Sequence, residues 1–269
     1  MVSFPFCKIN LGLTILSKRA DGYHNLDTCF YPVPWTDVLE IVLSEKFTFS
    51  TSGNIIPGKT EDNLCVKAYH LLKENFNLGP VSMHLHKIIP SGAGLGGGSS
   101  DAAHTLQLLN TIFSLNLSRS KLMEYAAILG SDCAFFIQDK PMIGTGRGEV
   151  LRPIDFSLKK FVVIVKPDIH VSTRDAFSGI TPRDADTSVG EVILNQPVSQ
   201  WKNLLINDFE GTLFSKYPLL ASVKHGMYEL GAVYASMTGS GSAIFGIFES
   251  EIDVAGDFSQ MVHWSGFIP

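Results

Sequence analysis

The sequence predicts a mixed α/β protein with two domains, and three observations support this fold class. The chain has 269 residues, which is long for one domain and suits two small ones. Hydrophobic residues make up 45% of it and charged residues 17%, so it can bury substantial cores and is not a disordered chain. Segments with alternating hydrophobic residues occur beside segments with helical spacing, and a glycine-rich loop joins one such pair.

The composition excludes several classes of partner. The formal net charge is −5, so we expect no nucleic-acid partner, and an anionic ligand would need positive charge supplied locally by lysines or helix termini. No stretch of 18 apolar residues occurs, so we expect no membrane span. Lys8 and Asn10 interrupt the short apolar run near the N-terminus, which argues against a signal peptide.

The cysteines predict a reduced, cytoplasmic protein. No two of them are close enough in sequence to form a metal-binding pair, so we expect no metal site of this kind. Free thiols also fit their spacing better than a disulfide framework. They are Cys7, Cys29, Cys65 and Cys133.

The first predicted element is a strand over residues 5–16. Hydrophobic side chains alternate along it with polar or small ones, so Lys8 and Asn10 share one face, with Cα atoms about 6.6 Å apart. A solvated face is the ordinary explanation for a lone lysine. Asparagine is disfavoured in mid-strand, however, and its presence indicates a functional pair.

A turn at residues 20–22 comes next, followed by Tyr23 and His24, which on chemistry alone are ordinary loop residues. Pro32 and Pro34 then separate predicted strands. These strands are expected over residues 26–33, 38–43 and 46–50.

A glycine-rich loop at residues 88–104 is the most informative stretch. A half-buried strand over residues 81–85 precedes it, and Ser99 and Ser100 lead into a helix that begins at Asp101. Free N–H groups and the positive end of a helix dipole make such a loop a phosphate site. A plain strand-to-helix turn does not need five glycines. They are Gly92, Gly94, Gly96, Gly97 and Gly98.

Two familiar phosphate loops do not match this one. The dinucleotide fingerprint expects an acidic residue about 20 positions further on, and none occurs between Asp101 and Glu124. The Walker loop requires a lysine directly before the serine or threonine of the helix, whereas Ser99 follows a glycine. The nearest lysine, Lys87, precedes the loop.

Two further helices are predicted, one before the loop and one after it. A helix is expected from Asn63 or the acidic residues before it, and another from Ser118 to Gly130. Asp132 comes directly after the second, where its charge opposes the helix dipole, so it is a turn former or a functional group. Residues 144–149 predict a tight hairpin. We place one domain over residues 1–153 and the other over residues 154–269.

The second domain opens with a strand and a helix that Ser172 or Thr173 caps. Residues 178–198 show little pattern and predict an exposed loop. A helix over residues 219–230 leads to a second glycine loop at residues 235–248, which alone would be a glycine-kinked strand.

Segments in three places resemble motifs of one kinase family. Residues 8–13, 90–103 and 235–248 resemble its first, central and third motifs, in order and at plausible spacing. The family is named for galactokinase, homoserine kinase, mevalonate kinase and phosphomevalonate kinase. The resemblance implies a two-domain small-molecule kinase fold with a ribosomal-protein-like N-terminal βαβ domain, a ferredoxin-like C-terminal domain and an active site in the cleft.

Residues 19–26 resemble a segment of one family member, whose substrate is the cytidyl diphosphate of a branched sugar alcohol. The resemblance implies ATP-dependent phosphorylation of the 2-hydroxyl of that alcohol, a step in isoprenoid precursor synthesis, by a monomer or weak homodimer. Two alternatives are a sister kinase for homoserine or a mevalonate derivative and a non-catalytic nucleotide-binding relative. The Gly-Tyr-His step at residues 22–24 argues against the first, and intact Lys8 and Asp132 argue against the second.

The resemblance also assigns roles in phosphoryl transfer. Asp132 accepts or orients the proton of the attacking hydroxyl, and Lys8 stabilises the developing negative charge. Asn63 and Lys87 lie near the adenosine. Mg²⁺ accompanies ATP, with Ser100 as a contact. The ATP phosphates are held by Pro90, Ser91, Gly92, Ala93, Gly94, Leu95, Gly96, Gly97, Gly98, Ser99 and Ser100.

For the acceptor, the resemblance implies a pocket that holds cytosine. Tyr23 and Phe177 stack on the two faces of the base, and His24 reads its polar edge. Asn10 binds the substrate near the lysine, and Thr173 contacts it near the transferred group.

Overall fold

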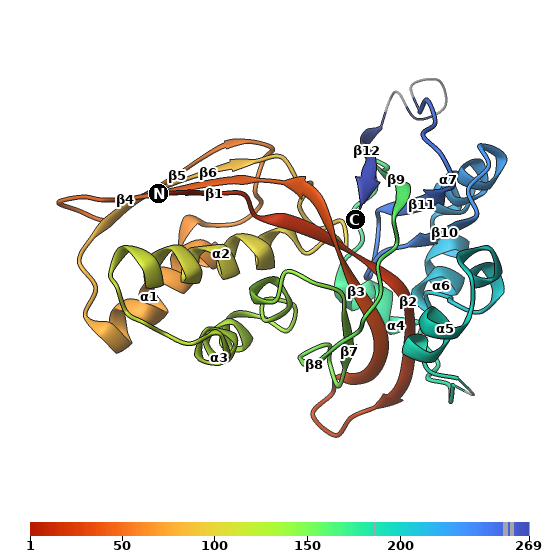
Figure 1. Cartoon of the computed structure of the whole chain (residues 1–269), viewed down its shortest axis with the longest axis horizontal. Helices are drawn as coiled ribbons and strands as arrows, with labels where there is room; N and C mark the ends of the chain where they lie inside the picture. The colour runs from red at the N-terminus through yellow and green to blue at the C-terminus, as the bar shows by residue number, and fades with distance from the viewer. Residues whose placement is uncertain (186, 255–257, 259–260, 269) are drawn as a thin grey trace. The chain divides into compact units, whose positions relative to one another are not determined.

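The computed structural model describes residues 1–185, 187–254, 258 and 261–268, which form two compact units (Figure 1). Unit 1 comprises Met1–Lys8, Pro34–Ser91 and Gly96–Asp139, and unit 2 comprises Ile9–Val33, Gly92–Leu95 and Lys140–Pro269. The chain therefore passes between the units several times, whereas the predicted boundary near residues 151–155 divides it once. That boundary stays a prediction.

Unit 1 contains a four-stranded sheet in the order β1-β4-β6-β5. Only the β5–β6 pair is parallel among the pairs of this sheet in the described residues. Three α-helices lie on one face of the sheet, and α2 packs against β1 and β4 (Figure 1). The elements are β1 (Val2–Ser3), β4 (Val38–Leu43), β5 (Thr48–Gly53), η1 (Thr60–Asp62), α1 (Leu64–Phe76), β6 (Val81–Lys87), α2 (Gly97–Ile112), α3 (Arg119–Leu129) and η2 (Phe135–Ile137).

The helix ends of unit 1 follow the caps in the sequence, with one exception. Asn63 caps α1 by accepting from Cys65 N, and Ser118 caps α3 by accepting from Lys121 N, as predicted. Helix α2, however, begins at Gly97, before the predicted start, and its cap is Gly96 at φ 72°. The left-handed backbone at Gly96 lets the helix start among the glycines, so glycines contribute its first free N–H groups.

His104, on α2, is held against the N-terminal residues of unit 1. Its Nδ1 lies 2.6 Å from Ser3 Oγ, and its ring packs edge-on against Phe6 with centroids 5.7 Å apart. Its Nε2 is buried and has no hydrogen-bond partner among the described residues. Burial lowers the pKa of His104 to about 4, because a charged imidazole would lose its hydration there.

We expect His104 to make folding stability depend on pH. Its pKa is lower in the folded chain than the ordinary 6.5, so its contribution is present above pH 6.5 and is lost as the pH falls through about 4. The difference in unfolding free energy between wild type and His104→Gln will change by roughly 2 kcal/mol between pH 7.5 and pH 5. Urea unfolding measures it, with exposed His225→Gln as the control; a constant difference would contradict the prediction.

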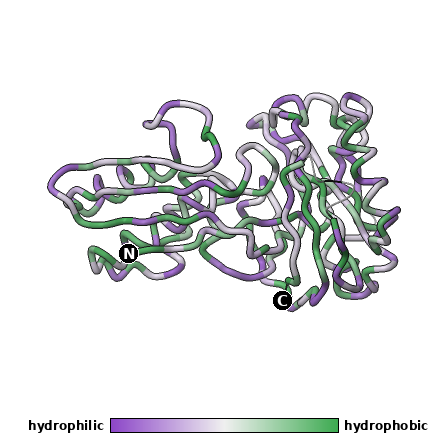
Figure 2. Tube along the Cα trace, turned by 90° about the horizontal axis from the view of Figure 1, so that it is seen from above, coloured by the Kyte–Doolittle hydropathy of each residue, from purple (hydrophilic) through white to green (hydrophobic). Residues whose placement is uncertain are grey.

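Unit 2 contains two sheets, in the orders β2-β3-β7-β8 and β10-β11-β9-β12. Helix α7 packs against β10 and β11. Figure 2 shows hydrophobic stretches along the inner strands and hydrophilic ones on the outer turns. The elements are β2 (Phe6–Lys18), β3 (His24–Thr36), β7 (Met142–Thr145), β8 (Val150–Pro153), β9 (Lys160–Lys166), α4 (Thr173–Ser178), α5 (Val189–Asn195), η3 (Val198–Asn203), α6 (Phe209–Lys216), α7 (Pro218–Glu229), β10 (Tyr234–Met237), β11 (Ile244–Phe248) and β12 (Val262–Ile268).

Two predictions for unit 2 were wrong. Pro32 and Pro34 do not break a strand, because β3 runs through both; its pairing with β7 covers residues 28–30, so neither proline removes an N–H that β7 needs. Residues 178–198 are not simply an exposed loop, because they include α5, which buries Val189 and Ile193. Residue 186 of this segment lies outside the described residues.

All four cysteines are free and buried. Cys7, Cys65 and Cys133 belong to unit 1, and Cys29 belongs to unit 2. Burial raises the pKa of each thiol above its ordinary value, to about 12 for Cys133. In the described part of the chain, none of the helices combines the length and the hydrophobicity that crossing a membrane requires.

Candidate active site

Lys8 and Asp132 meet in unit 1, beside the start of α2. Lys8 Nζ lies 3.7 Å from Asp132 Oδ2; the lysine side chain is buried, and the aspartate side chain is 32% exposed. Burial lowers the pKa of Lys8, and the charge of Asp132 opposes this shift. The solvated-face alternative for Lys8 is therefore wrong. A carboxylate open to solvent and paired with a buried ammonium is suited to orienting a hydroxyl and stabilising its negative charge.

Gly96 and Gly97 leave no room for side chains near this pair. A Cβ atom at Gly96 would lie 2.7 Å from the Phe136 ring and 3.3 Å from Lys8 Cε. A Cβ atom at Gly97 would lie 2.9 Å from Lys87 Nζ. At Gly98, by contrast, nothing lies within 4 Å. The backbone of Gly98 is therefore open to a ligand at the N-terminus of α2, where N–H groups favour an anion.

A buried triad of charged side chains lies next to the glycine loop and consists of Asp37, Lys87 and Asp101. Lys87 Nζ donates to a carboxylate oxygen of Asp37 and, at 2.7 Å, to Asp101 Oδ2. Asp37 Oδ1 also accepts from the N–H groups of Ile88 and Ile89 at 2.6 and 2.8 Å. Burial raises the pKa of Asp101 to about 7, and Asp37 adds to this shift while Lys87 opposes it. The triad sets the path of the chain into the glycine loop.

A cavity of about 210 Å³ brings several predicted ATP residues of unit 1 together. Its lining includes Asn63, Lys87, Ser91 and Gly98. The ammonium group of Lys87, however, is paired with Asp37 and Asp101. The lining includes hydrophobic side chains, which suit a base, and the backbone of Gly98 at the N-terminus of α2, which suits a phosphate. The full lining is Phe49, Thr51, residues 56–60, Asp62, Asn63, Leu64, Lys87, Ser91, Gly98 and Asp101.

In unit 2, Asn10 is buried and its amide holds the second glycine loop. Its Oδ1 accepts from Gly239 N at 2.9 Å and from Thr238 Oγ1 at 3.2 Å, and its Nδ2 donates to Thr28 Oγ1 at 2.9 Å. The solvated-face alternative is wrong for Asn10 as well. Its predicted contact with substrate stays a prediction.

The first half of the central glycine loop, Gly92–Leu95, rests on the second glycine loop within unit 2. Gly94 O accepts from Thr238 Oγ1 at 3.2 Å, and Ala93 O accepts from Ala243 N at 3.1 Å. A Cβ atom at Gly94, where φ is +77°, would lie 2.1 Å from Thr238 O. Ala93 and Leu95 are almost completely buried, so neither presents its side chain to a ligand.

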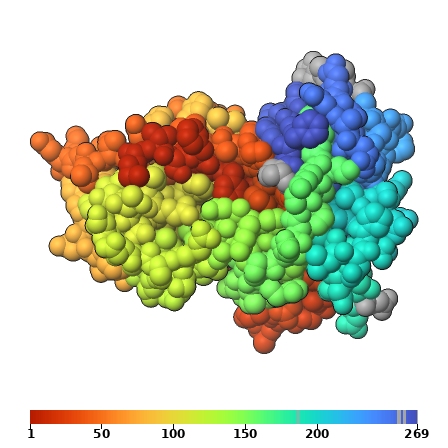
Figure 3. Space-filling view, in the orientation of Figure 1, coloured from red at the N-terminus to blue at the C-terminus, as the bar shows by residue number. Residues whose placement is uncertain are grey.

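The predicted cytosine residues lie in unit 2, where His24 and Phe177 stack with ring centroids 4.9 Å apart. Burial and the charge of Lys18 lower the pKa of His24. Tyr23 is 56% exposed, and the Arg147 guanidinium lies 4.8 Å from the centre of its ring. Figure 3 shows the green surface of the residues after 140 beside the red-orange turn between β2 and β3. A base can cover this face of Phe177 only if His24 moves.

Thr173 is exposed and is the first residue of α4. The N-cap of α4 is Ser172, whose side chain accepts from Asp175 N at 3.0 Å, so Thr173 does not cap the helix. Sequence reasoning missed Asp37 and Arg147 as neighbours of the predicted site residues. A lone aspartate or arginine carries no local signal for partners far along the chain.

Comparisons with known proteins identify the family. Residues 63–140 match the model for the GHMP kinases N terminal domain, and residues 196–261 match that for GHMP kinases C terminal. The chain is 55% identical over 256 residues to a 4-diphosphocytidyl-2-C-methyl-D-erythritol kinase of Bacteroides fragilis, with 93% of each chain covered. The chain belongs to the GHMP kinase family. A protein of the same name from Cytophaga hutchinsonii is 51% identical, with 93% of each chain covered.

Solved GHMP kinases share the fold. The crystal structure of a 4-(cytidine 5'-diphospho)-2C-methyl-D-erythritol kinase superposes with a TM-score of 0.81 at 30% identity, covering 100% of this chain and 99% of that one. A homoserine kinase from Cytophaga hutchinsonii superposes with a TM-score of 0.69 at 16% identity, covering 98% and 95%. The predicted family and fold class are confirmed. The chain is an enzyme, a small-molecule kinase, and its family implies ATP as the phosphate donor.

Proposed function

We propose that this kinase transfers the γ-phosphate of ATP to the 2-hydroxyl of 4-diphosphocytidyl-2-C-methyl-D-erythritol, a step in isoprenoid precursor synthesis. The chemistry rests above all on the pairing of buried Lys8 with Asp132 at 3.7 Å beside the start of α2. The choice of acceptor is supported by relatives of that name at up to 55% identity among those compared. The predicted cytoplasmic location and the monomer or weak homodimer stay predictions.

In the proposed mechanism, positioning and charge neutralisation do most of the work, as phosphoryl transfer requires. The backbone of the glycine loop and the N-terminus of α2 hold the phosphates. Asp132 accepts or orients the proton of the attacking hydroxyl. The Lys8 ammonium stabilises the negative charge that develops on the attacking oxygen.

We include Mg²⁺ in the proposal because of Ser100. Its Oγ is fully buried in the first turn of α2 and has no hydrogen-bond partner in the part of the chain that the structure describes. A hydroxyl oxygen is a ligand that Mg²⁺ accepts, and the ion is usually held by few protein groups together with substrate phosphates. When bound, it neutralises charge on the transferred phosphate.

The acceptor half of the proposal predicts effects confined to the cytidyl substrate. Tyr23→Ala and Phe177→Ala will each raise its KM by roughly 5- to 150-fold and leave ATP affinity unchanged, because stacking on a base is worth about 1–3 kcal/mol. His24→Ala will relax discrimination between cytidyl and uridyl forms, since these bases differ in a hydrogen-bonding group. Measured kcat/KM for both forms decides; changes only in ATP parameters would assign these residues to the wrong ligand.

A coupled assay of ADP release tests the proposed function directly. The purified chain is given ATP and, in turn, the diphosphocytidyl substrate, homoserine and mevalonate. Turnover with the first alone is expected. Faster turnover with either of the others would favour a sister kinase of the family.

A further inference from the structure

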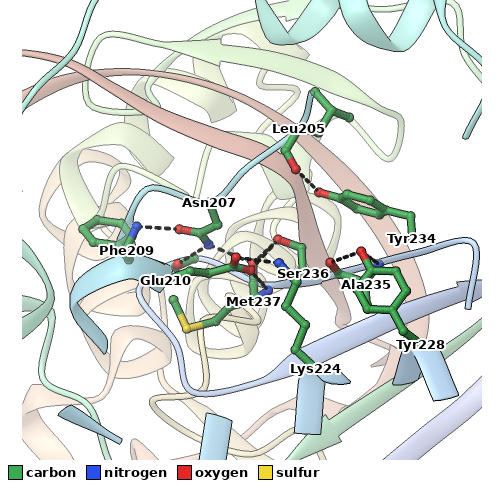
Figure 4. Close-up of polar contacts among 11 residues, drawn as sticks. Leu205, Asn207, Phe209, Glu210, Lys224, Tyr228, Tyr234, Ala235, Ser236 and Met237 are labelled. Atoms are coloured by element: carbon green, nitrogen blue, oxygen red, sulfur yellow. Dashed lines mark hydrogen bonds and ion pairs between the residues drawn. The ribbon is translucent and has the colours of Figure 1, made fainter. Parts of the chain in front are cut away.

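The segment between η3 and α6 carries buried Asn207, and the first turn of α6 carries buried Glu210; the proposed mechanism uses neither side chain (Figure 4). Strand β2 fixes this segment, because Leu13 N donates to Ile206 O at 3.0 Å and Leu13 O accepts from Asp208 N at 2.9 Å. Burying an amide and a carboxylate is costly unless their partners are well placed. Their partners lie in the second glycine loop and the strand that enters it.

Asn207 uses both of its amide N–H donors on this loop. Its Nδ2 donates to Met237 O at 2.8 Å and to Gly239 O at 2.9 Å, and its Oδ1 accepts from Phe209 N at 3.1 Å. The two carbonyls lie on either side of Thr238 in the sequence. A single buried side chain therefore fixes the peptide group before Thr238 and the peptide group after Gly239.

Glu210 holds the strand that leads into the loop. Its Oε1 accepts from Met237 N at 2.8 Å and from Ser236 Oγ at 3.0 Å. Its Oε2 accepts from Lys224 Nζ at 2.6 Å, which balances the buried charge (Figure 4). The carboxylate thus fixes the strand, and Asn207 fixes the turn that follows it.

The same turn contacts the central glycine loop on its other side. Gly239 N donates to Asn10 Oδ1 while Gly239 O accepts from Asn207, so this residue is held from both directions. The single proton of Thr238 Oγ1 is shared between Gly94 O and Asn10 Oδ1, each 3.2 Å away, and a Cβ atom at Gly239 would lie 3.0 Å from Gly94 Cα. Any shift of residues 238–239 must therefore move Gly94.

We propose that Asn207 is a positioning residue of the ATP site, which fixes residues 237–239 and through them the Gly92–Leu95 segment. This inference rests on the proposed function, in which that segment binds ATP phosphates. Asn207 itself touches neither substrate. It fixes the backbone of the loop before ATP binds. Ordering that backbone during binding would lower the affinity for ATP.

The decisive variant is Asn207→Asp, which keeps the size of the side chain but replaces the two N–H donors by an acceptor facing two carbonyl groups. We expect the KM and the dissociation constant for ATP to rise roughly tenfold or more, since loss of a buried hydrogen bond leaves its partners unpaired. The KM for the cytidyl acceptor will change less than twofold. Thr238→Val, which removes the hydroxyl contacts with Gly94 and Asn10, will show the same rise in the KM and the dissociation constant for ATP.

Tyr228→Phe is the matched control. It removes two hydrogen bonds to Ala235 in the same network, at 3.1 and 3.2 Å, without touching residues 237–239. Its ATP parameters should equal those of wild type even if its thermal midpoint falls. All variants are compared well below their thermal midpoints. If Asn207→Asp does not fold, Thr238→Val decides.

ATP binding measured by calorimetry tests the positioning role of Asn207 separately from the proposed function. Unchanged ATP binding in Asn207→Asp and Thr238→Val, or an equal loss in Tyr228→Phe, overturns the positioning role while leaving the proposed function intact. Wild type that binds ATP but phosphorylates none of the acceptors overturns the proposed substrate, and the role of Asn207 is then still decided by the binding constants. Wild type that does not bind ATP overturns both.

Discussion

Asp132→Asn is expected to bind ATP as wild type does and to turn over about 10²–10⁴-fold more slowly, the usual cost of removing a general base. Asparagine keeps the shape of the side chain and can still accept one hydrogen bond. It cannot take a proton or carry the negative charge that faces Lys8 at 3.7 Å. The substituted side chain is partly exposed, so little packing is lost, although the ammonium of buried Lys8 loses the charge opposite it.

Single-turnover rates with saturating ATP and acceptor measure this effect, and calorimetry measures ATP binding. Asp139→Asn is a matched control, since Asp139 lies in the same unit with a side chain that is 57% exposed and pairs with Arg119 at the surface. A rate for Asp132→Asn within a few-fold of wild type would make Asp132 a turn residue and nothing more.

Lys87→Met is expected to destabilise unit 1 by about 3–5 kcal/mol, the usual cost of removing one partner of a buried ion pair. Methionine fills much of the lysine's volume but leaves the carboxylates of Asp37 and Asp101 buried without the cation that bonds to both. The backbone N–H groups of Ile88 and Ile89 would still reach Asp37. Asp101 would keep no such donor among the hydrogen bonds described.

The loss of unfolding free energy in Lys87→Met should be smaller at low pH. This pH dependence distinguishes a lost ion pair from lost packing. The pKa of Asp101 is already about 7 with Lys87 present, and removing the lysine takes away an effect that lowers it. As the pH falls below this value, Asp101 binds a proton and its repulsion of Asp37 disappears. Urea unfolding at pH 8 and pH 5.5 measures the change. Lys67→Met, at an exposed pair with Asp62, is the control, and a loss independent of pH would point to packing alone.

Candidate site residues can be predicted where the chemistry depends on residues adjacent in the sequence. The glycines at residues 92–98 and the aspartate after Gly130 belong to local backbone patterns, so sequence alone could single them out as candidates. The partners of Lys87 were not predictable in this way, because Asp37 lies 50 residues away and no local pattern marks it. Asn10 and Asn207 likewise act on a loop more than 25 residues further along the chain.

Some misses had a usable signal. Ser188 and Glu191 form a capping box at the start of α5, and serine followed three residues later by glutamate is readable in the sequence. The start of α2 at Gly97 was harder to predict, because glycine is a poor helix former. The left-handed backbone at Gly96 allows this early start. Tertiary packing settled what the propensities could not.

The rates at which the four buried thiols can be labelled report local unfolding of the chain around each of them. Only a thiolate reacts with an alkylating reagent, and raised pKa values leave almost none of it in the closed chain at neutral pH. Modification must then wait for transient unfolding around each sulfur. Because Cys29 belongs to unit 2 and the other three to unit 1, the rates of labelling would show whether the two units open together or each on its own.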